Sequence, residues 1–468
     1  MAQRRPVPAG ENKMGTMPIA PLLLSMALPM MASNLFQALY NVVDSFWVAK
    51  LGQDALNAVS LAFPLQNLMF SLGIGTGVGI NALLSRSLGA KRQETADRAA
   101  NTGIFLCFCS AIVFAFVGLF LSRPFFLALT SNEQVVSYGA AYTSICLGLS
   151  FGVFGQVCFE RLLQSTGRTL LSMVSQITGA LINMILDPIL ILGLFGAPKL
   201  EVAGAAVATV IGQFIAAGIA VYLNVRHNPD IHLRLRDIRW HGVTAQEIYR
   251  VGFPSILMMS VGSVMNFFLN RILISFTEAA TAVFGVYFKL QSFVFMPVFG
   301  LNNGMVPIVS YNYGALREDR LKGVIRIAVI SAISLMFTGF LIFQFFPGQL
   351  MSLFKPTEEA MLAQYDEMLA IGKVALRIIS LCFPFAGFCI IAGSVCQAIG
   401  NPFYSLIVSV CRQLVVLLPS AWLLAQTGKL DLVWFAFVIA EGMSLVLSVI
   451  FLRRTMTAAE EHFRRERG

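Results

Sequence analysis

Twelve apolar segments, most of them roughly 20–28 residues long, follow one another through this chain of 468 residues. A helix rises about 1.5 Å per residue, so a segment of this length can cross the hydrocarbon core of a bilayer. The pattern therefore predicts an all-α polytopic membrane protein. The predicted spans are 18–46, 55–84, 98–121, 135–159, 169–195, 201–225, 250–275, 281–310, 323–346, 369–396, 403–426 and 432–452.

The composition excludes most other classes of protein. Hydrophobic residues make up 57% of the chain, charged residues make up 12%, and the mean hydropathy is +0.75. An ordinary soluble domain carries about 25% charged residues. A disordered chain, a nucleic-acid-binding domain and most soluble enzymes are thereby excluded, and we do not expect an enzyme.

The placement of Lys and Arg predicts the orientation of the chain. Of these residues, 24 fall in the two tails and the alternate loops on one side, with Arg161 and Arg412 counted among them, against five in the opposite loops. Cytoplasmic loops carry the excess of Lys and Arg, so both termini are predicted to be cytoplasmic in a multi-pass protein of a cytoplasmic membrane. The net charge of +9 is then a topological signal, and no nucleic-acid partner is expected.

An internal repeat divides the chain into two halves. A shift of 225 residues aligns 29–90 with 254–315 without a gap, and 12 of the 62 columns are identical, among them Pro29/Pro254, Asn41/Asn266 and Gln66/Gln291. Six spans per half make the repeat parallel, which predicts two six-helix lobes related by a pseudo-twofold axis along the membrane normal. Parallel repeats of this kind are typical of transporters.

The repeat and the spans together define the expected domains. A cytoplasmic tail at 1–16 precedes the first lobe at 17–225, which holds spans 1–6. A cytoplasmic linker at 226–249 leads to the second lobe at 250–453, which holds spans 7–12, and a cytoplasmic tail follows at 454–468.

Ionisable side chains within a bilayer are costly, so each one is a candidate functional residue. Of the 24 acids, three fall inside the predicted spans: Asp44, Asp187 and Glu441. Asp44 ends a stripe with Asn34, Gln37 and Asn41, which recur on one face of a helix. Such a stripe faces other helices or a water-filled cavity, so we expect the three amides to line a substrate cavity.

A second polar stripe lies in span 5. Asn183 and Asp187 are four residues apart and share a helix face. Gln176 extends that face by two turns and is a further candidate for lining the substrate cavity. Because span 1 and span 5 both start on the cytoplasmic side, Asp44 and Asp187 are expected in the outer half of the first lobe.

The second lobe carries fewer polar residues. Glu441 could face a cavity of that lobe or pair with Arg271, Lys289 or Arg377. Lys289 occupies the repeat position of Pro64, eight residues into its span. The other cavity candidates in this lobe are Asn266 and Asn270.

The sequence lacks the motifs of ATP hydrolysis and of metal or redox chemistry. No Walker sequence is present, so ATP-driven export is not expected, and we expect no cofactor. The four His residues fall in polar segments, and the eight Cys residues lie in apolar runs without a C-x-x-C pair. We therefore expect the thiols to be buried and reduced. We do not expect an intramembrane enzyme of the transferase or protease type.

An ordered set of motifs over about residues 15–455 resembles the MATE (multidrug and toxic compound extrusion) family, in a DinF-like or related bacterial branch. The motifs are Asn41-x-x-Asp44 followed by Leu51-Gly52, Ser85-Arg86-Ser87-Leu88-Gly89-Ala90, Gln164-x-x-Gly167-Arg168, Asn183-x-x-x-Asp187-Pro188 and Gly204-Ala205-Ala206-x-Ala208-Thr209.

The resemblance implies a secondary antiporter. Amphipathic, often cationic organic compounds would leave as H⁺ or Na⁺ enters, through a protein expected to act as a monomer. It further implies that Asp44, Asn183, Asp187 and Thr209 form the ion-coupling site, with Na⁺ as a candidate ion at the first three, and that Pro29 lets the first span bend. Acids that the sodium-coupled branch carries in spans 7 and 10 are absent from this sequence.

One alternative from the same wider superfamily is a flippase for lipid-linked oligosaccharides or polysaccharides. Such a protein needs a strongly cationic cavity, which Arg271, Lys289 and Arg377 could supply. The sequence leaves this alternative open.

Overall fold

The computed structural model describes residues 12–355 and 362–467, and all the regular elements within these ranges are helices. Most of the tail predicted at 1–16 and residues 356–361 lie outside the described residues. The short elements include α1 (Lys13–Thr16), η1 (Leu194–Gly196), η2 (Leu235–Asp237) and α12 (Pro347–Ser352).

The twelve predicted spans are confirmed as ten long apolar stretches and two bent pairs. The pairs are α5 (Glu133–Gly148) with α6 (Phe151–Ser165), bent by 43°, and α13 (Leu362–Ser380) with α14 (Phe383–Ile399), bent by 49°. The others are α2 (Ile19–Ala49), α3 (Gln53–Gly89), α4 (Gln93–Leu129), α7 (Thr169–Leu192), α8 (Val202–His227), α9 (Gly242–Ile274), α10 (Glu278–Gly314), α11 (Glu318–Phe345), the run α15 (Pro402–Val410), η4 (Cys411–Leu417) and α16 (Leu418–Ala425), and α17 (Leu430–Val433) with α18 (Phe435–Arg467).

Many of the helices are longer than the apolar runs that predict them. The run at 135–159 continues as helix to Ser165, and α18 extends through most of the tail predicted at 454–468. The linker predicted at 226–249 shortens to 228–241, because α8 ends at His227 and α9 begins at Gly242. Hydropathy reports the apolar part of a helix, whereas the backbone hydrogen bonds continue into its polar ends.

The helix α7 shows why these residues form a membrane protein. Its buried side chains are mostly small or polar and recur every three or four residues: Thr169, Ser172, Ser175, Gly179, Asn183, Asp187 and Ile191. Its large apolar side chains point outward, and Leu170 and Ile185 are 57% and 61% exposed. This pattern is the reverse of a soluble helix and suits lipid on the outer face.

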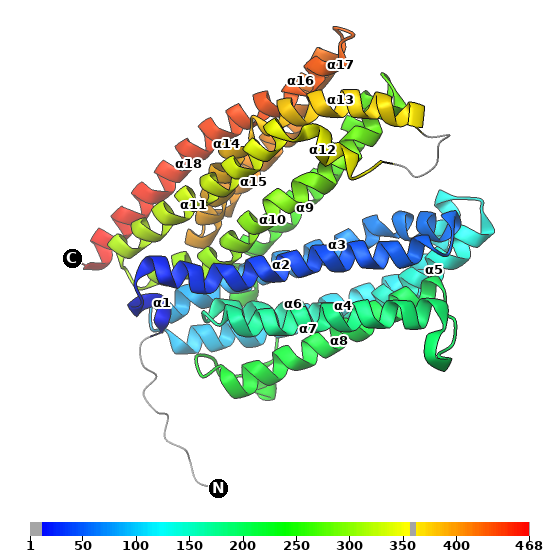
Figure 1. The fold of residues 1–468 in the computed structure, drawn as a ribbon. Helices are drawn as coiled ribbons and strands as arrows, with labels where there is room; N and C mark the ends of the chain where they lie inside the picture. Colours follow the sequence, from blue (N-terminus) through cyan, green and yellow to red (C-terminus); the bar gives the residue numbers. More distant parts are fainter. Residues whose placement is uncertain (1–11, 356–361, 468) are drawn as a thin grey trace. The chain divides into compact units, whose positions relative to one another are not determined.

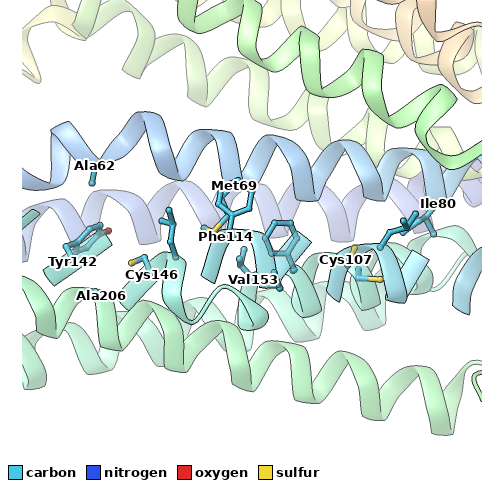
Figure 2. Close-up of a cluster of buried hydrophobic side chains, with 14 of the residues drawn as sticks. Ala62, Met69, Ile80, Cys107, Phe114, Tyr142, Cys146, Val153 and Ala206 are labelled. Atoms are coloured by element: carbon cyan, nitrogen blue, oxygen red, sulfur yellow. The ribbon is translucent and has the colours of Figure 1, made fainter. Parts of the chain in front are cut away.

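Contacts divide the chain into two compact units. Unit 1 comprises Met1–Ile256 and Ser310–Arg317, and unit 2 comprises Leu257–Val309 and Glu318–Gly468. In unit 1, α7 packs between α2 and α8 (Figure 1). Figure 2 shows part of the apolar core of unit 1, where Met69 of α3 and Phe114 of α4 lie beside Cys146 of α5 and Val153 of α6.

In unit 2, α14 packs against α11 and α18. Its core includes an aromatic group on α10 and α18, in which the ring of Phe437 lies 6.1 Å from Phe284 and 5.9 Å from Tyr287. Each unit thus has its own packed interior.

Candidate functional site

Three helices of unit 1 bring the predicted ion-coupling residues together. Asn183 and Asp187 lie one turn apart on the buried face of α7, and Thr209 projects from α8. Asp44 comes from the last turns of α2. All four side chains are buried, and Asp187 is 0% exposed. We call these four residues the Asp187 cluster.

Asn183 connects the helices through hydrogen bonds. Its amide is satisfied at both ends when its nitrogen donates to Asp187 Oδ2 at 3.0 Å. Its oxygen then accepts from Thr209 Oγ1 at 3.0 Å and from the Thr209 backbone N–H at 2.8 Å. Tyr40 of α2 reaches Thr209 Oγ1 at 3.5 Å, the outer limit of a hydrogen bond. Thr209 is therefore linked to α7 and α2.

The two carboxyl groups of the cluster are incompletely satisfied. Asp44 and Asp187 lie close enough for their charges to interact. Oδ1 of each is buried and has no hydrogen-bond partner among the residues that the structure describes. A buried carboxylate oxygen without a donor is costly, and a proton or a bound cation relieves that cost.

The donor atoms of the cluster suit a hard cation. Two carboxylates, an amide oxygen and a hydroxyl are all oxygen donors, the kind of ligand that hard metal ions prefer. Across the described residues, no group of three or more His, Cys, Asp and Glu could hold a metal ion. The donor atoms of the Asp187 cluster are therefore all oxygens.

Close packing of α7 against α8 sets the geometry of the cluster. Gly179 and Gly212 face each other, and a Cβ on Gly212 would lie 2.7 Å from the Gly179 carbonyl oxygen. Gly179 is one turn before Asn183, and Gly212 is one turn after Thr209. The glycines therefore allow the approach that joins Asn183 to Thr209.

The residues of the α2 stripe have different surroundings. Asp44 is buried, Asn34 is half-buried, and Gln37 and Asn41 are exposed. Pro29, a predicted bend, lies inside α2, which continues through it as one helix.

The structure reveals a fourth buried acid that the sequence analysis misses. Glu160 lies in α6, one residue beyond the span predicted to end at 159, and is 4% exposed. It accepts from Gln156 Nε2 at 3.0 Å, Gln176 Nε2 at 2.8 Å and Ser175 Oγ at 3.1 Å. A longer span 4, with Glu160 and Gln156 four residues apart, is the signal that would have found it.

Gln176, predicted to line the cavity, therefore binds Glu160. It lies two turns before Asn183 on α7, so this second polar group and the Asp187 cluster share one helix.

In unit 2, Glu441 pairs with a residue outside the predicted set. Arg412 Nη1 lies 3.2 Å from Glu441 Oε2, whereas the expected partners were Arg271, Lys289 and Arg377. Arg412 belongs to η4, inside the predicted span 403–426, and not to a loop. Its count among the loop residues was wrong because it lies nine residues into that span.

The other polar candidates of unit 2 have separate contacts. Lys289 lies over the ring of Phe354 at 5.8 Å, and Arg271 lies over Phe267 at 5.8 Å. Arg377 Nε donates to the Gln344 carbonyl at 3.3 Å. Asn266 and Asn270 are half-buried.

Comparisons with known proteins give a consistent result. A model of the MatE family matches residues 29–189 and 254–423, so its two matches begin at the repeat partners Pro29 and Pro254. An FAD transporter of Shewanella oneidensis is 26% identical over 411 residues, which cover 86% of this chain and 88% of that protein. The probable multidrug resistance protein YoeA of Bacillus subtilis is 28% identical over 427 residues, 90% of each chain.

Solved structures agree with the sequence relatives. An outward-facing structure of a multidrug resistance MATE family transporter of the MOP superfamily matches with a TM-score of 0.87 and 25% identity. The match covers 94% of this chain and 96% of that one. The two-lobe helical fold expected from the repeat is thereby confirmed.

Proposed function

The chain belongs to the MatE family of membrane transporters, and on that premise we propose that it is a multidrug efflux antiporter. It exports amphipathic, often cationic organic compounds and takes up H⁺ or Na⁺ in exchange. Two relatives support the efflux of organic molecules, since one is a probable multidrug resistance protein and the other an FAD transporter.

The observation that carries the coupling proposal is the Asp187 cluster. Asp44 and Asp187 each keep a buried carboxylate oxygen without a donor among the described residues. A proton or Na⁺ entering from outside removes that cost, with Asn183 and Thr209 orienting Asp187. Antiport follows when the ion-bound form holds the organic substrate less tightly than the ion-free form, because a ligand shifts a conformational equilibrium only through different affinities for its states.

The remaining assignments follow from the same proposal. Both termini face the cytoplasm of a bacterial cell, as the placement of Lys and Arg predicts. The transporter works as a monomer, the ion gradient supplies the energy, and neither ATP nor a cofactor takes part.

The test is transport in proteoliposomes with a proton gradient and a sodium gradient imposed separately. We expect one of the two gradients to drive export of a cationic dye such as rhodamine 6G. Asp187→Asn and Asp44→Asn should each abolish gradient-driven export. Asp431→Asn, which changes an exposed acid at the start of α17, is the matched control and should retain it. Normal export by both cluster variants would refute the coupling assignment.

The flippase alternative is less well supported. Arg271, Lys289 and Arg377 each contact a different neighbour, and no contact among the three is seen in the described residues. If Lys289→Gln and Arg377→Gln leave dye export unchanged, the antiporter is favoured, whereas a flippase should fail.

A further inference from the structure

The pair of Arg412 and Glu441 is an unusual feature of unit 2. Glu441 is 4% exposed, and the two side chains lie on membrane-spanning helices. A charged pair buried in a low-dielectric interior gains stability only when the remaining donors and acceptors are also satisfied. The hydrogen bonds of this pair therefore indicate whether its role is structural.

The pair is incompletely satisfied. Within the residues that the structure describes, Arg412 makes one hydrogen bond, from Nη1 to Glu441 Oε2, rather than the two parallel bonds that an Arg–carboxylate pair can form. Oε1 of Glu441 has no hydrogen-bond partner in the described part of the chain. A guanidinium has five N–H donors, so most of those on Arg412 are available, and 36% of its side chain is accessible.

The local backbone sets Arg412 apart from an ordinary helical residue. It lies in the π-helical turn η4, between the α-helical stretches α15 and α16. Such turns widen a helix by one residue per turn and occur frequently at functional sites.

The surroundings of the pair combine polar and aromatic groups. Ser444 and Ser448 follow Glu441 on the same face of α18 and are buried. Tyr287 is close enough to feel the charges of both Arg412 and Glu441, and its ring lies 5.9 Å from Phe437. The pair therefore lies against the aromatic core of unit 2.

We propose that Arg412 is a binding site for an anionic group of the transported compound, a carboxylate in particular, and that Glu441 holds and neutralises the guanidinium when no such ligand is present. This inference rests on the proposed efflux function and extends its substrate range from cations to zwitterions. An incoming carboxylate forms the bidentate contact that Glu441 leaves unmade. Glu441 is thus a competitor of the ligand as well as a partner of Arg412.

A matched pair of dyes isolates the single carboxylate. Rhodamine 6G is the ethyl ester of rhodamine 19, so the two share one cationic chromophore and differ in a free carboxylate. Binding of each dye to the purified transporter at neutral pH is measured by fluorescence anisotropy. We expect Arg412→Gln to weaken rhodamine 19 binding by about tenfold or more, the scale of a charge-assisted hydrogen bond, and to leave rhodamine 6G within about twofold.

Two further variants separate recognition from structural damage. Glu441→Gln removes the competitor, so it should tighten rhodamine 19 binding, whereas the loss of a purely structural pair would tighten neither dye. The double variant Arg412→Gln with Glu441→Gln leaves no unpaired charge and should show the same selective loss as Arg412→Gln. Arg377→Gln, which removes another span arginine of unit 2, is the control and should change neither dye.

The outcomes distinguish this inference from the proposed function. Equal effects of the Arg412 variants on both dyes, or unchanged binding of rhodamine 19, would overturn the anion site and leave the export of cations standing. If the wild-type protein binds neither dye, the multidrug function fails and the inference fails with it.

Discussion

Replacing Gly212 with alanine should disrupt the Asp187 cluster without touching any of its side chains. Gly212 lies where α8 crosses α7, and its added Cβ would meet the Gly179 carbonyl oxygen at 2.7 Å and Asn183 Cβ at 3.3 Å. The first contact involves backbone, which cannot rotate away. The helices must therefore separate at this crossing.

The size of the effect follows from these distances. An ordinary contact of a Cβ begins at 3.4 Å, so the helices must move apart by about 0.7 Å. The bonds from Thr209 to Asn183, now 2.8 and 3.0 Å, would lengthen toward about 3.5 Å and be largely lost. Overpacking lowers the free energy of unfolding by about 1–3 kcal/mol. The better helix propensity of alanine compared with glycine restores up to about 1 kcal/mol.

The assay is gradient-driven dye export in proteoliposomes, together with thermal unfolding in detergent. Losing two hydrogen bonds of about 1 kcal/mol each should reduce export by about tenfold or more. Gly218→Ala is the matched control on the same helix, since its Cβ meets nothing within 4 Å. If Gly212→Ala behaves like Gly218→Ala in both measurements, the helix contact does not hold the cluster and the reasoning is refuted.

Three further predictions concern stability, each measured by thermal unfolding in detergent. Glu160→Leu leaves the half-buried Nε2 donors of Gln156 and Gln176 without their acceptor, whereas Ser175 Oγ keeps its bond to the Ala216 carbonyl. The change should cost about 2–4 kcal/mol, and Glu160→Gln should cost less; equal costs would contradict the hydrogen-bonded role. Gly118→Ala places a Cβ 2.4 Å from backbone nitrogen and should destabilise the protein, unlike Gly285→Ala, whose Cβ meets nothing within 4 Å. The hydrogen bond from Tyr138 lowers the pKa of Glu201. This contact therefore stabilises the fold above the ordinary glutamate pKa, and its contribution is lost as the pH falls through the lowered pKa. Glu201→Gln should remove that part of the loss of stability in acid.

The periodicity of the sequence is enough to predict the polar stripe of α7. The spacing of Asn183 and Asp187 places them on one face of any helix, and lipid cannot solvate that face, so it turns inward. Resemblance to a family added Thr209, whose hydroxyl and backbone N–H both reach Asn183. Neither the periodicity nor the resemblance predicts which carboxylate oxygens lack a hydrogen-bond partner, because those partners come from three different helices.

The sequence failed where a helix continues beyond its apolar run. Glu160 falls just outside the span predicted at 135–159 because hydropathy falls at the polar end of α6, although the backbone stays helical to Ser165. Arg412 is a different case, since it lies inside its predicted span, and its partner Glu441 lies 29 residues further along the chain. No local pattern links residues that far apart.

The sequence by itself determined the membrane class, the twelve spans and the repeat, because hydrophobic length and periodicity are local properties that the bilayer enforces. The tertiary structure alone decided which acid meets which donor. Pairing depends on how closely helices approach, and this distance is set by contacts such as that of Gly179 with Gly212. The physical reason is that burial makes each unmatched polar atom costly, and only the packed helices decide which atoms are matched.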